Sequence, residues 1–308
     1  MDTNLTSSPP KRIILDHQLA AFEKLVAVAT ACFSIQRNTL PVNPRSNSLI
    51  IGPSGSGKTF LARAVAEEVG VEFLSISVSE WILLGASGRG AVMTWPLIFQ
   101  FLLQNKGKSG AVIFVDEVDK IGGDSSWERF LRSEVFRLLD LQLPAGITNG
   151  DGDSVGRNDH ASVSEVLSNR TLLLAAGAFQ GIWDERSRTK LGFGSQAGPE
   201  PGLSPSTLVK TLPLELVNRF RGELVILPAL GEADYRKMLE RTAKEVPVYL
   251  RDTFMRLGLE RIHEVARLQQ GCRFLEELML DCILHERAVI KMLKADLCST
   301  PIEFKHEP

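Results

Sequence analysis

The stretch GPSGSGKT occupies residues 52–59 and directly follows the apolar run LII at residues 49–51. Its spacing fits G-x-x-x-x-G-K-[ST], the pattern of a phosphate-binding loop between a strand and a helix. Glycines let successive backbone N–H groups converge on a phosphate, where the helix N-terminus also favours negative charge. Lys58 is then placed to reach the β- and γ-phosphates, and the Thr59 hydroxyl to ligate Mg²⁺. The stretch predicts a strand, a nucleotide-phosphate cradle and a helix.

A second apolar run ends in two acids. Residues 111–115 read AVIFV and are followed directly by Asp116 and Glu117. Such a run is typical of a buried central strand, which delivers its last residues to the ligand-binding edge of a parallel sheet. We expect Asp116 to hold Mg²⁺ through water and Glu117 to polarise the attacking water. Together the two motifs predict an ATPase with ATP and Mg²⁺ as cofactors.

The composition sets outer limits. With 308 residues, 44% hydrophobic and 23% charged, the chain is long enough for one large domain and a smaller one. The four cysteines are scattered without C-x-x-C spacing, which favours a reducing cytoplasm over a zinc site or disulfide framework. No apolar run has the length needed to cross a bilayer, so we expect no membrane insertion. The net charge of −2 gives no electrostatic reason to expect nucleic acid.

Alternating helix and strand patterns predict an α/β fold with a doubly wound parallel sheet. We expect strands over residues 71–78, 171–176 and 223–226 besides the two above, and helices over residues 17–35, 60–69, 91–104 and 126–141. The polar residues 145–168 predict a mobile surface loop or disorder. We expect a disordered tail over residues 1–10, a large ATPase domain over 11–230 and a small all-α lid over 231–308.

These ordered motifs resemble the AAA+ ATPases, and within them the ClpX/HslU-like unfoldases, over nearly the whole chain. IGPSGSGKT and IFVDEVDKI resemble Walker A and Walker B, and GAFQG at residues 177–181 resembles the segment after the sensor-1 strand. A polar sensor-1 side chain is absent, because Ala175 and Ala176 occupy that strand end. The resemblance implies a nucleotide site built from Ile13, Ile14, Gly52, Pro53, Ser54, Gly55, Ser56, Gly57, Lys58, Thr59, Phe60 and Arg273.

Two arginines extend the resemblance. Arg219, in LELVNRFRGEL, falls where the family carries the arginine finger that a subunit offers to its neighbour, although Arg221 is a near alternative. Arg273, in GCRFLEEL, matches the sensor-2 position on the lid. Taken singly, each arginine could instead be a solvated surface charge. A finger acting in trans implies a ring, so we expect a homohexamer whose catalytic residues are Glu117, Asp116, Lys58 and Arg219.

The predicted pore segment departs from ClpX. Residues 85–88 read GASG where ClpX-type unfoldases carry GYVG, so the usual tyrosine is missing. SEW at residues 79–81 and SGR at 87–89 resemble the SKW…SGK pore segment of pachytene-checkpoint-type AAA+ proteins, which remodel HORMA-domain proteins. Trp81, with Ala86 and Ser87, is then predicted to contact substrate in the pore. The alternative is that Trp81 is packed at a strand-to-helix junction.

Several functions stay open. The leading hypothesis is a hexameric ATP-driven remodeller of a protein partner, by resemblance a bacterial HORMA-domain protein in an antiviral second-messenger system. The second is a ClpX-like unfoldase that feeds a peptidase ring, because LGFG at residues 191–194 resembles the IGFG docking loop. A DNA-directed AAA+ ATPase rests on fold analogy alone. A non-enzymatic nucleotide switch is the last alternative, against which Lys58, Asp116 and Glu117 argue.

Overall fold

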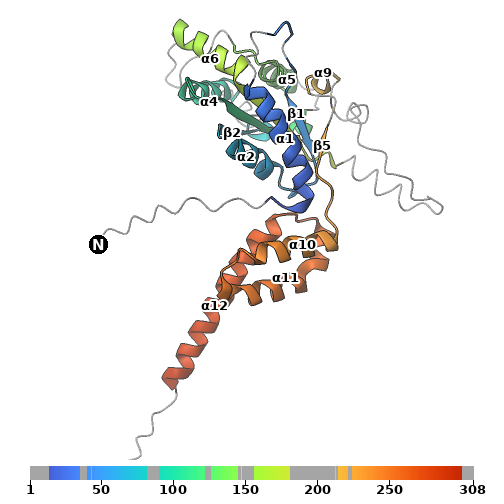
Figure 1. Ribbon diagram of the computed structural model, residues 1–308, viewed down its shortest axis with the longest axis vertical. Helices are drawn as coiled ribbons and strands as arrows, with labels where there is room; N and C mark the ends of the chain where they lie inside the picture. The colour runs from blue at the N-terminus through green and yellow to red at the C-terminus, as the bar shows by residue number, and fades with distance from the viewer. Residues whose placement is uncertain are drawn as a thin grey trace, which may run out of the picture. The chain divides into compact units, whose positions relative to one another are not determined.

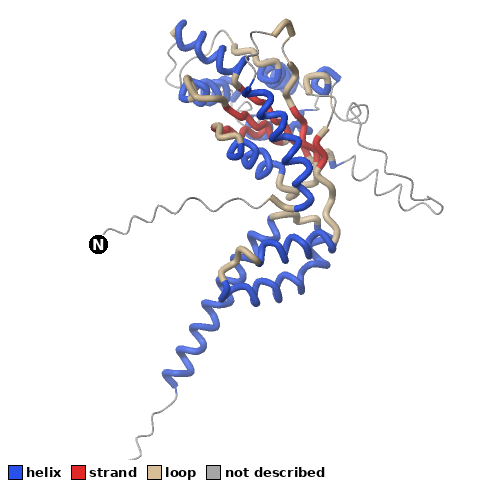
Figure 2. Tube along the Cα trace, in the orientation of Figure 1, coloured by secondary structure: helices blue, strands red, loops and turns tan. Residues whose placement is uncertain are grey.

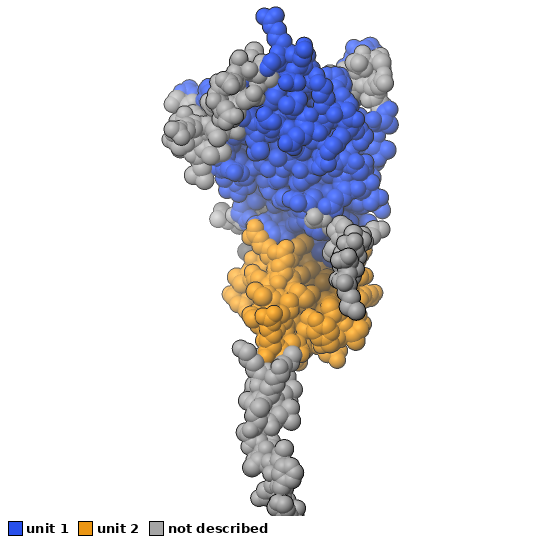
Figure 3. All heavy atoms as spheres, turned by 90° about the vertical axis from the view of Figure 1, so that its left-hand side faces the viewer, with its two compact units in different colours: residues 1–229 blue, residues 230–308 orange. Residues whose placement is uncertain are grey.

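The computed structural model describes residues 14–34, 40–42, 44–81, 90–121, 126–144, 147, 156–180, 212, 214–220 and 224–299. The chain divides into two compact units, Met1–Ala229 and Leu230–Pro308, which carry separate colours in Figure 3. The domain boundary that we predict after residue 230 falls next to this division. No helix in the described ranges has both the length and the apolar character that crossing a membrane requires.

A five-stranded parallel sheet forms the centre of the first unit (Figure 2). Its spatial order is β2-β3-β4-β1-β5, and every neighbouring pair runs parallel. The strands are β1 (Ser48–Ile51), β2 (Glu72–Ser77), β3 (Ala111–Asp116), β4 (Thr171–Gly177) and β5 (Val225–Ile226). Because all strands run the same way, the ends of β1 and β3 lie at one edge, which brings the loop after β1 and the acids after β3 together.

Two hydrophobic clusters cover the two faces of this sheet. Ile113 and Val115 of β3 join one cluster, whereas Val112 and Phe114 join the other, because successive side chains of a strand point to opposite faces. Helices α1 (Asp16–Ser34) and α2 (Lys58–Glu68) contribute to the second cluster, and α4 (Gly90–Gln104), α5 (Ser126–Leu139) and α6 (Arg157–Asn169) to the first (Figure 1). Burial on both faces explains why β1, β3 and β4 are almost wholly apolar. The predicted α/β class is confirmed.

Helix α6 corrects the prediction of a loop or disorder over residues 145–168. The helix spans Arg157–Asn169 and buries Val163, Val166 and Leu167, which lie three and four residues apart on one face. Those side chains enter the same hydrophobic cluster as α4 and α5. Packing of this narrow apolar face holds the helix, while its remaining residues are polar enough to suggest a loop.

The regular elements described in the second unit are the helices α10 (Glu232–Ala243), α11 (Val248–Leu268) and α12 (Arg273–Ser299), joined by short turns. Tyr235 is fully buried and meets Phe274 edge to face, with ring centroids 6.0 Å apart. The Tyr235 hydroxyl accepts a hydrogen bond of 2.7 Å from the backbone N–H of Gly271, which lies just before α12. This contact ties α10 to the start of α12.

Candidate nucleotide-binding and hydrolysis site

The loop after β1 has the backbone that an anion site needs. Gly55 and Gly57 adopt φ angles of 78° and 84°, a region that only glycine enters without strain. A Cβ at Gly52 would lie 2.8 Å from Ser56 Oγ and 2.9 Å from Leu227 Cβ, so the first loop position has no room for a side chain. Helix α2 starts directly after the loop, and its first N–H groups face the site.

Two polar groups of the loop suit a phosphate ligand. Ser56 Oγ is buried and has no hydrogen-bond partner among the described residues. Lys58 Nζ donates to the carbonyl oxygens of Gly52 at 2.9 Å and Pro53 at 3.0 Å, so its charge lies against the loop. Phosphate oxygens could accept from both groups, and the bond from Lys58 would be charge-assisted. Of the other predicted contacts, Ser54 lies in the loop, Phe60 in the first turn of α2 and Ile14 just before α1, whereas Ile13 lies outside the described residues.

Helix α1 contacts this loop through Gln18. The Gln18 side chain is fully buried, and its Nε2 donates to the Ser56 carbonyl at 3.1 Å. Its Oε1 accepts from the Leu15 backbone N–H at 3.2 Å, and His17 Nε2 lies 3.4 Å from the same Ser56 carbonyl. The segment predicted to contact adenine is therefore linked directly to the phosphate loop. Sequence reasoning missed this role, although a polar residue on the buried face of α1 is a signal for it.

We expect Gln18→Ala to lower the free energy of unfolding by about 1–3 kcal/mol, because both buried hydrogen bonds disappear. ATP affinity should fall as well, since the Ser56 carbonyl loses its amide donor. Denaturant unfolding and an ATP titration measure the two effects. Gln104→Ala, at an exposed position of α4, is the control and should change neither. Unchanged ATP affinity in Gln18→Ala would show that the loop holds its shape without α1.

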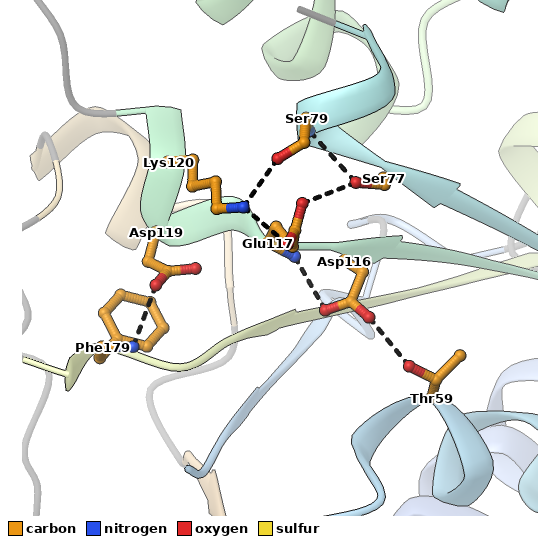
Figure 4. A network of polar contacts seen from close by, with 8 residues as sticks. All are labelled: Thr59, Ser77, Ser79, Asp116, Glu117, Asp119, Lys120 and Phe179. Carbon is orange, nitrogen blue, oxygen red and sulfur yellow. Dashed lines mark hydrogen bonds and ion pairs between the residues drawn. The ribbon is translucent and has the colours of Figure 1, made fainter. Parts of the chain in front are cut away.

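Asp116 and Thr59 meet at the sheet edge. The Thr59 hydroxyl donates to Asp116 Oδ2 at 2.9 Å, and the Glu117 backbone N–H donates to Asp116 Oδ1 at 2.8 Å (Figure 4). Sequence reasoning assigned Thr59 and Asp116 to Mg²⁺, and the fold brings these two residues into direct contact. Hydroxyl and carboxylate oxygens, completed by water and phosphate, are the donors that Mg²⁺ prefers. The residues present therefore fit the metal.

Glu117 turns toward β2 instead (Figure 4). Its Oε1 lies 2.7 Å from Lys120 Nζ, and its Oε2 accepts from the Ser77 hydroxyl at 2.8 Å. Lys120 also donates to the Ser79 hydroxyl at 2.9 Å. Glu117 has a φ of 61°, which is uncommon for a residue with a side chain and sets this direction. The acid is thus held by groups that sequence reasoning did not select.

The pKa of Glu117 is lowered from 4.5 to about 2, chiefly because Lys120 hydrogen-bonds its carboxylate. Hydrogen bonds from Ser79 and Ser77 lower the pKa further, whereas burial raises it. At neutral pH Glu117 is therefore ionised, as a glutamate of ordinary pKa also is, and its low pKa makes the carboxylate a weaker proton acceptor while Lys120 contacts it. Lys120 is three residues after Glu117, and both belong to the turn that contains the 3-10 helix η2 (Val118–Ile121). Ser77 is the register partner of Asp116 on β2, a neighbour that only strand pairing reveals.

The segment after β4 is fixed on η2. The backbone N–H of Phe179, at a φ of 51°, donates to Asp119 Oδ2 at 3.1 Å. A Cβ at Gly177 would lie 2.5 Å from the Phe179 ring and 2.9 Å from Asp119 Oδ1. Ala175 and Ala176 are fully buried, so the end of β4 presents no polar side chain. The strand end contributes packing at this position.

The two predicted arginines lie in different units. Arg219 follows the short helix α9 (Leu214–Val217), and its Nε donates to Asp140 Oδ1 at 2.9 Å. Arg273 is the first residue of α12, and it is exposed. Arg221, the alternative finger, lies outside the described residues. The finger and sensor-2 roles remain predictions.

Trp81 is a core residue in this structure. Its side chain is fully buried in the cluster that contains α4, and it meets Trp95 edge to face with ring centroids 6.4 Å apart. The indole is therefore not exposed for a substrate, which favours the packing alternative over the gripping role. Ala86, Ser87 and the LGFG stretch at residues 191–194 lie outside the described residues.

The fold and the site define the class of protein. A phosphate-binding loop after β1 and two acids after β3, on a parallel sheet with β1 between β4 and β5, are the arrangement of a P-loop nucleotide-binding domain. Residues 48–143 match the family described as "ATPase family associated with various cellular activities (AAA)". This stretch of the chain therefore matches an AAA ATPase domain, as the motifs predict.

The relatives narrow this class. The chain is 27% identical over 214 residues to the ATP-dependent Clp protease ATP-binding subunit ClpX of Azotobacter vinelandii. This matched region covers 63% of this chain and 48% of that protein. The chain is also 51% identical over 74 residues to the ATP-dependent zinc metalloprotease FtsH of Thermobaculum terrenum. This matched region covers 24% of this chain and 11% of that protein. The chain thus spans about half the length of the first of these relatives and a tenth of the second. The resemblance to ClpX-type unfoldases is confirmed.

Proposed function

We propose that this chain couples ATP hydrolysis to the unfolding or remodelling of a protein partner. The observation that carries this proposal is the contact between Thr59 and Asp116 at 2.9 Å, with Glu117 beside it, at the edge where the phosphate loop opens. The similarity to ClpX over 214 residues supports the coupling to a protein substrate.

Each residue of the site then has a chemical task. The loop N–H groups, Ser56 and Lys58 bind and orient the phosphates of ATP, while Thr59 and Asp116 hold Mg²⁺. When bound, Mg²⁺ neutralises charge that develops on the phosphate oxygens. Glu117 accepts a proton from the attacking water. The contact with Lys120 fixes the position of the carboxylate and lowers its basicity.

We expect Lys58→Ala to weaken ATP binding about 10- to 100-fold, because a charge-assisted hydrogen bond contributes about 1.5–3 kcal/mol. Equilibrium titration with a fluorescent ATP analogue measures the change. Lys108→Ala is a matched control, since Lys108 forms an exposed ion pair with Glu72 in the same unit and should not affect binding. Wild-type affinity in Lys58→Ala would refute the assignment of the phosphate loop.

The oligomeric state is part of the proposal. Arg219 acts on the nucleotide of a neighbouring subunit, which requires a ring, and a homohexamer is the state that the resemblance implies. Arg273 acts as sensor 2 from the lid of the same subunit. Sedimentation with and without ATP tests the ring, and a monomer at every ATP concentration would contradict it.

The partner is the least constrained part. The relative named ClpX supports an unfoldase that supplies a peptidase, whereas the HORMA-domain partner and the antiviral role rest on the pore segment. That segment contributes a buried Trp81 and residues 87–89 outside the described part of the chain, so the observations favour the ClpX-like function. Nothing in the described residues supports a DNA substrate.

A direct test compares substrates. ATP hydrolysis should rise when an unfolded model polypeptide is added, and a folded fluorescent protein with an unstructured tag should lose its fluorescence only with ATP. Stimulation by a HORMA-domain protein alone would favour the other predicted partner. Hydrolysis that no protein alters, together with unchanged fluorescence, would refute coupling to protein unfolding.

A further inference from the structure

Arg219 is held on three sides within its own subunit. Its Nε donates to both carboxylate oxygens of Asp140, at 2.9 and 3.0 Å, and its Nη1 donates to the Glu215 carbonyl at 2.6 Å. The guanidinium carbon lies 4.2 Å from the centroid of the Phe136 ring, which covers one face of the group. Nη2 has no hydrogen-bond partner among the described residues. The guanidinium is therefore fixed in place while its outermost nitrogen keeps both donors.

The backbone around Arg219 is held as well. Asn47, directly before β1, donates from Nδ2 to the Leu139 carbonyl at 2.7 Å and to the Arg219 carbonyl at 3.3 Å. Arg45 donates to the Asn218 carbonyl. The end of α5 and the turn after α9 are thus joined through the segment that enters the phosphate-binding strand. This framework exceeds a lone surface ion pair, which would order the arginine poorly.

Partial exposure is consistent with a second partner for Arg219. Its side chain is 26% exposed and that of Asp140 is 36% exposed, so the pair lies at the surface of the first unit. Asp140 accepts from Nε and the Glu215 carbonyl accepts from Nη1, which leaves Nη2 of the planar guanidinium for an anion. A long side chain that is already ordered loses less freedom when it binds, so a fixed guanidinium binds a phosphate better than a mobile one.

We infer that Asp140 and Phe136 are positioning residues for Arg219, which hold its guanidinium so that Nη2 is available to a phosphate group bound by a neighbouring subunit. This inference rests on the proposed function, in which Arg219 acts in trans. Asp140 and Phe136 touch no nucleotide themselves. They act through Arg219 by setting its rotamer.

Asp140→Ala should lower kcat for ATP hydrolysis roughly tenfold and leave the ATP dissociation constant unchanged, since misplaced catalytic groups mainly slow the chemical step. Arg219→Ala should lower kcat further. In the Arg219→Ala background, Asp140→Ala should cause no additional loss, because a positioning residue has nothing left to position. A purely structural role of Asp140 would lower stability in both backgrounds alike.

The control is Glu165→Ala, which removes another exposed carboxylate paired with an arginine, Arg170, and should keep full hydrolysis. Asp140→Asn is the second variant if Asp140→Ala folds poorly, and thermal unfolding and ring assembly are measured for both.

Mixing Asp140→Ala with Glu117→Gln subunits should partly restore turnover. In mixed rings an intact Arg219 from a Glu117→Gln subunit can act on the intact site of an Asp140→Ala neighbour, as expected for a defect that acts in trans.

Three results would overturn the inference. Full hydrolysis by Asp140→Ala and Asp140→Asn, with Arg219→Ala impaired, would exclude positioning and leave the trans role of Arg219 standing. An equal further loss in the Arg219→Ala background would show that Asp140 acts through another group. Full hydrolysis by Arg219→Ala itself would overturn both the trans role and the positioning, so the two failures are distinguishable.

Discussion

Replacing Glu117 by glutamine is expected to leave ATP binding intact and to slow hydrolysis about 10²- to 10⁴-fold, the range that general base catalysis contributes. Glutamine has nearly the shape of glutamate, and its amide oxygen can still accept from Ser77 or Lys120. It cannot accept a proton from water at neutral pH. The contact between Thr59 and Asp116 is untouched, so the Mg²⁺ ligands stay in place.

Phosphate release under saturating ATP and an ATP titration measure the two halves of this prediction. Glu68→Gln, at an exposed position of α2, is the matched control and should hydrolyse ATP at the wild-type rate. If Glu117→Gln kept wild-type turnover, another group would have to accept the proton. The same variant, loaded with ATP, also supplies a trap for partners that dissociate only after hydrolysis.

Trp81→Ala is expected to lower the free energy of unfolding by about 3–5 kcal/mol, because the change removes a large, fully buried side chain and leaves a cavity. The edge-to-face contact with Trp95 disappears at the same time. Denaturant unfolding of the intact chain measures the loss. Phe130→Ala is the control, since that aromatic side chain is 51% exposed and its removal should cost much less.

The same variant separates the two functions considered for Trp81. If Trp81 is a core residue, Trp81→Ala lowers stability, and partner remodelling decreases only in proportion to the fraction of protein that stays folded. As a pore residue, it would leave stability unchanged while remodelling was lost and ATP hydrolysis persisted. A stable Trp81→Ala protein with that second behaviour would contradict the packing seen here and restore the gripping role.

The elements that sequence predicted well are those with a strong local signal. Strands β1, β3 and β4 are apolar along almost their whole length, because each is covered on both faces. That pattern can be seen in the sequence without knowing which strands pair with them. The phosphate loop is equally local, since its glycines supply the backbone conformation of the loop. Helix α6 was missed because only Val163, Val166 and Leu167 face the core, and its polar residues resemble a loop.

The residues of the site likewise fall into those that sequence motifs specify and those that only the fold brings together. Lys58, Thr59, Asp116 and Glu117 could be selected from sequence, because contiguous motifs specify them through local chemistry. Lys120 and Ser77 could not, since their contact with Glu117 depends on a 3-10 turn and on the pairing of β2 with β3. Gln18 reaches the phosphate loop across 38 residues. Its position on the buried face of α1 signals a polar residue that needs a partner, but no local pattern identifies that partner.

Sequence by itself determined that this protein has a phosphate-binding loop, a strand ending in two acids, an α/β sheet and a helical C-terminal part, because each follows from a contiguous pattern of residues. Only the tertiary structure decided that Trp81 is buried, that Glu117 is paired with Lys120 and that Arg219 is held by Asp140. The free energy of burial places Trp81. The ion pair of Glu117 depends on the turn after β3, and that of Arg219 depends on the packing that brings the end of α5 beside the turn after α9.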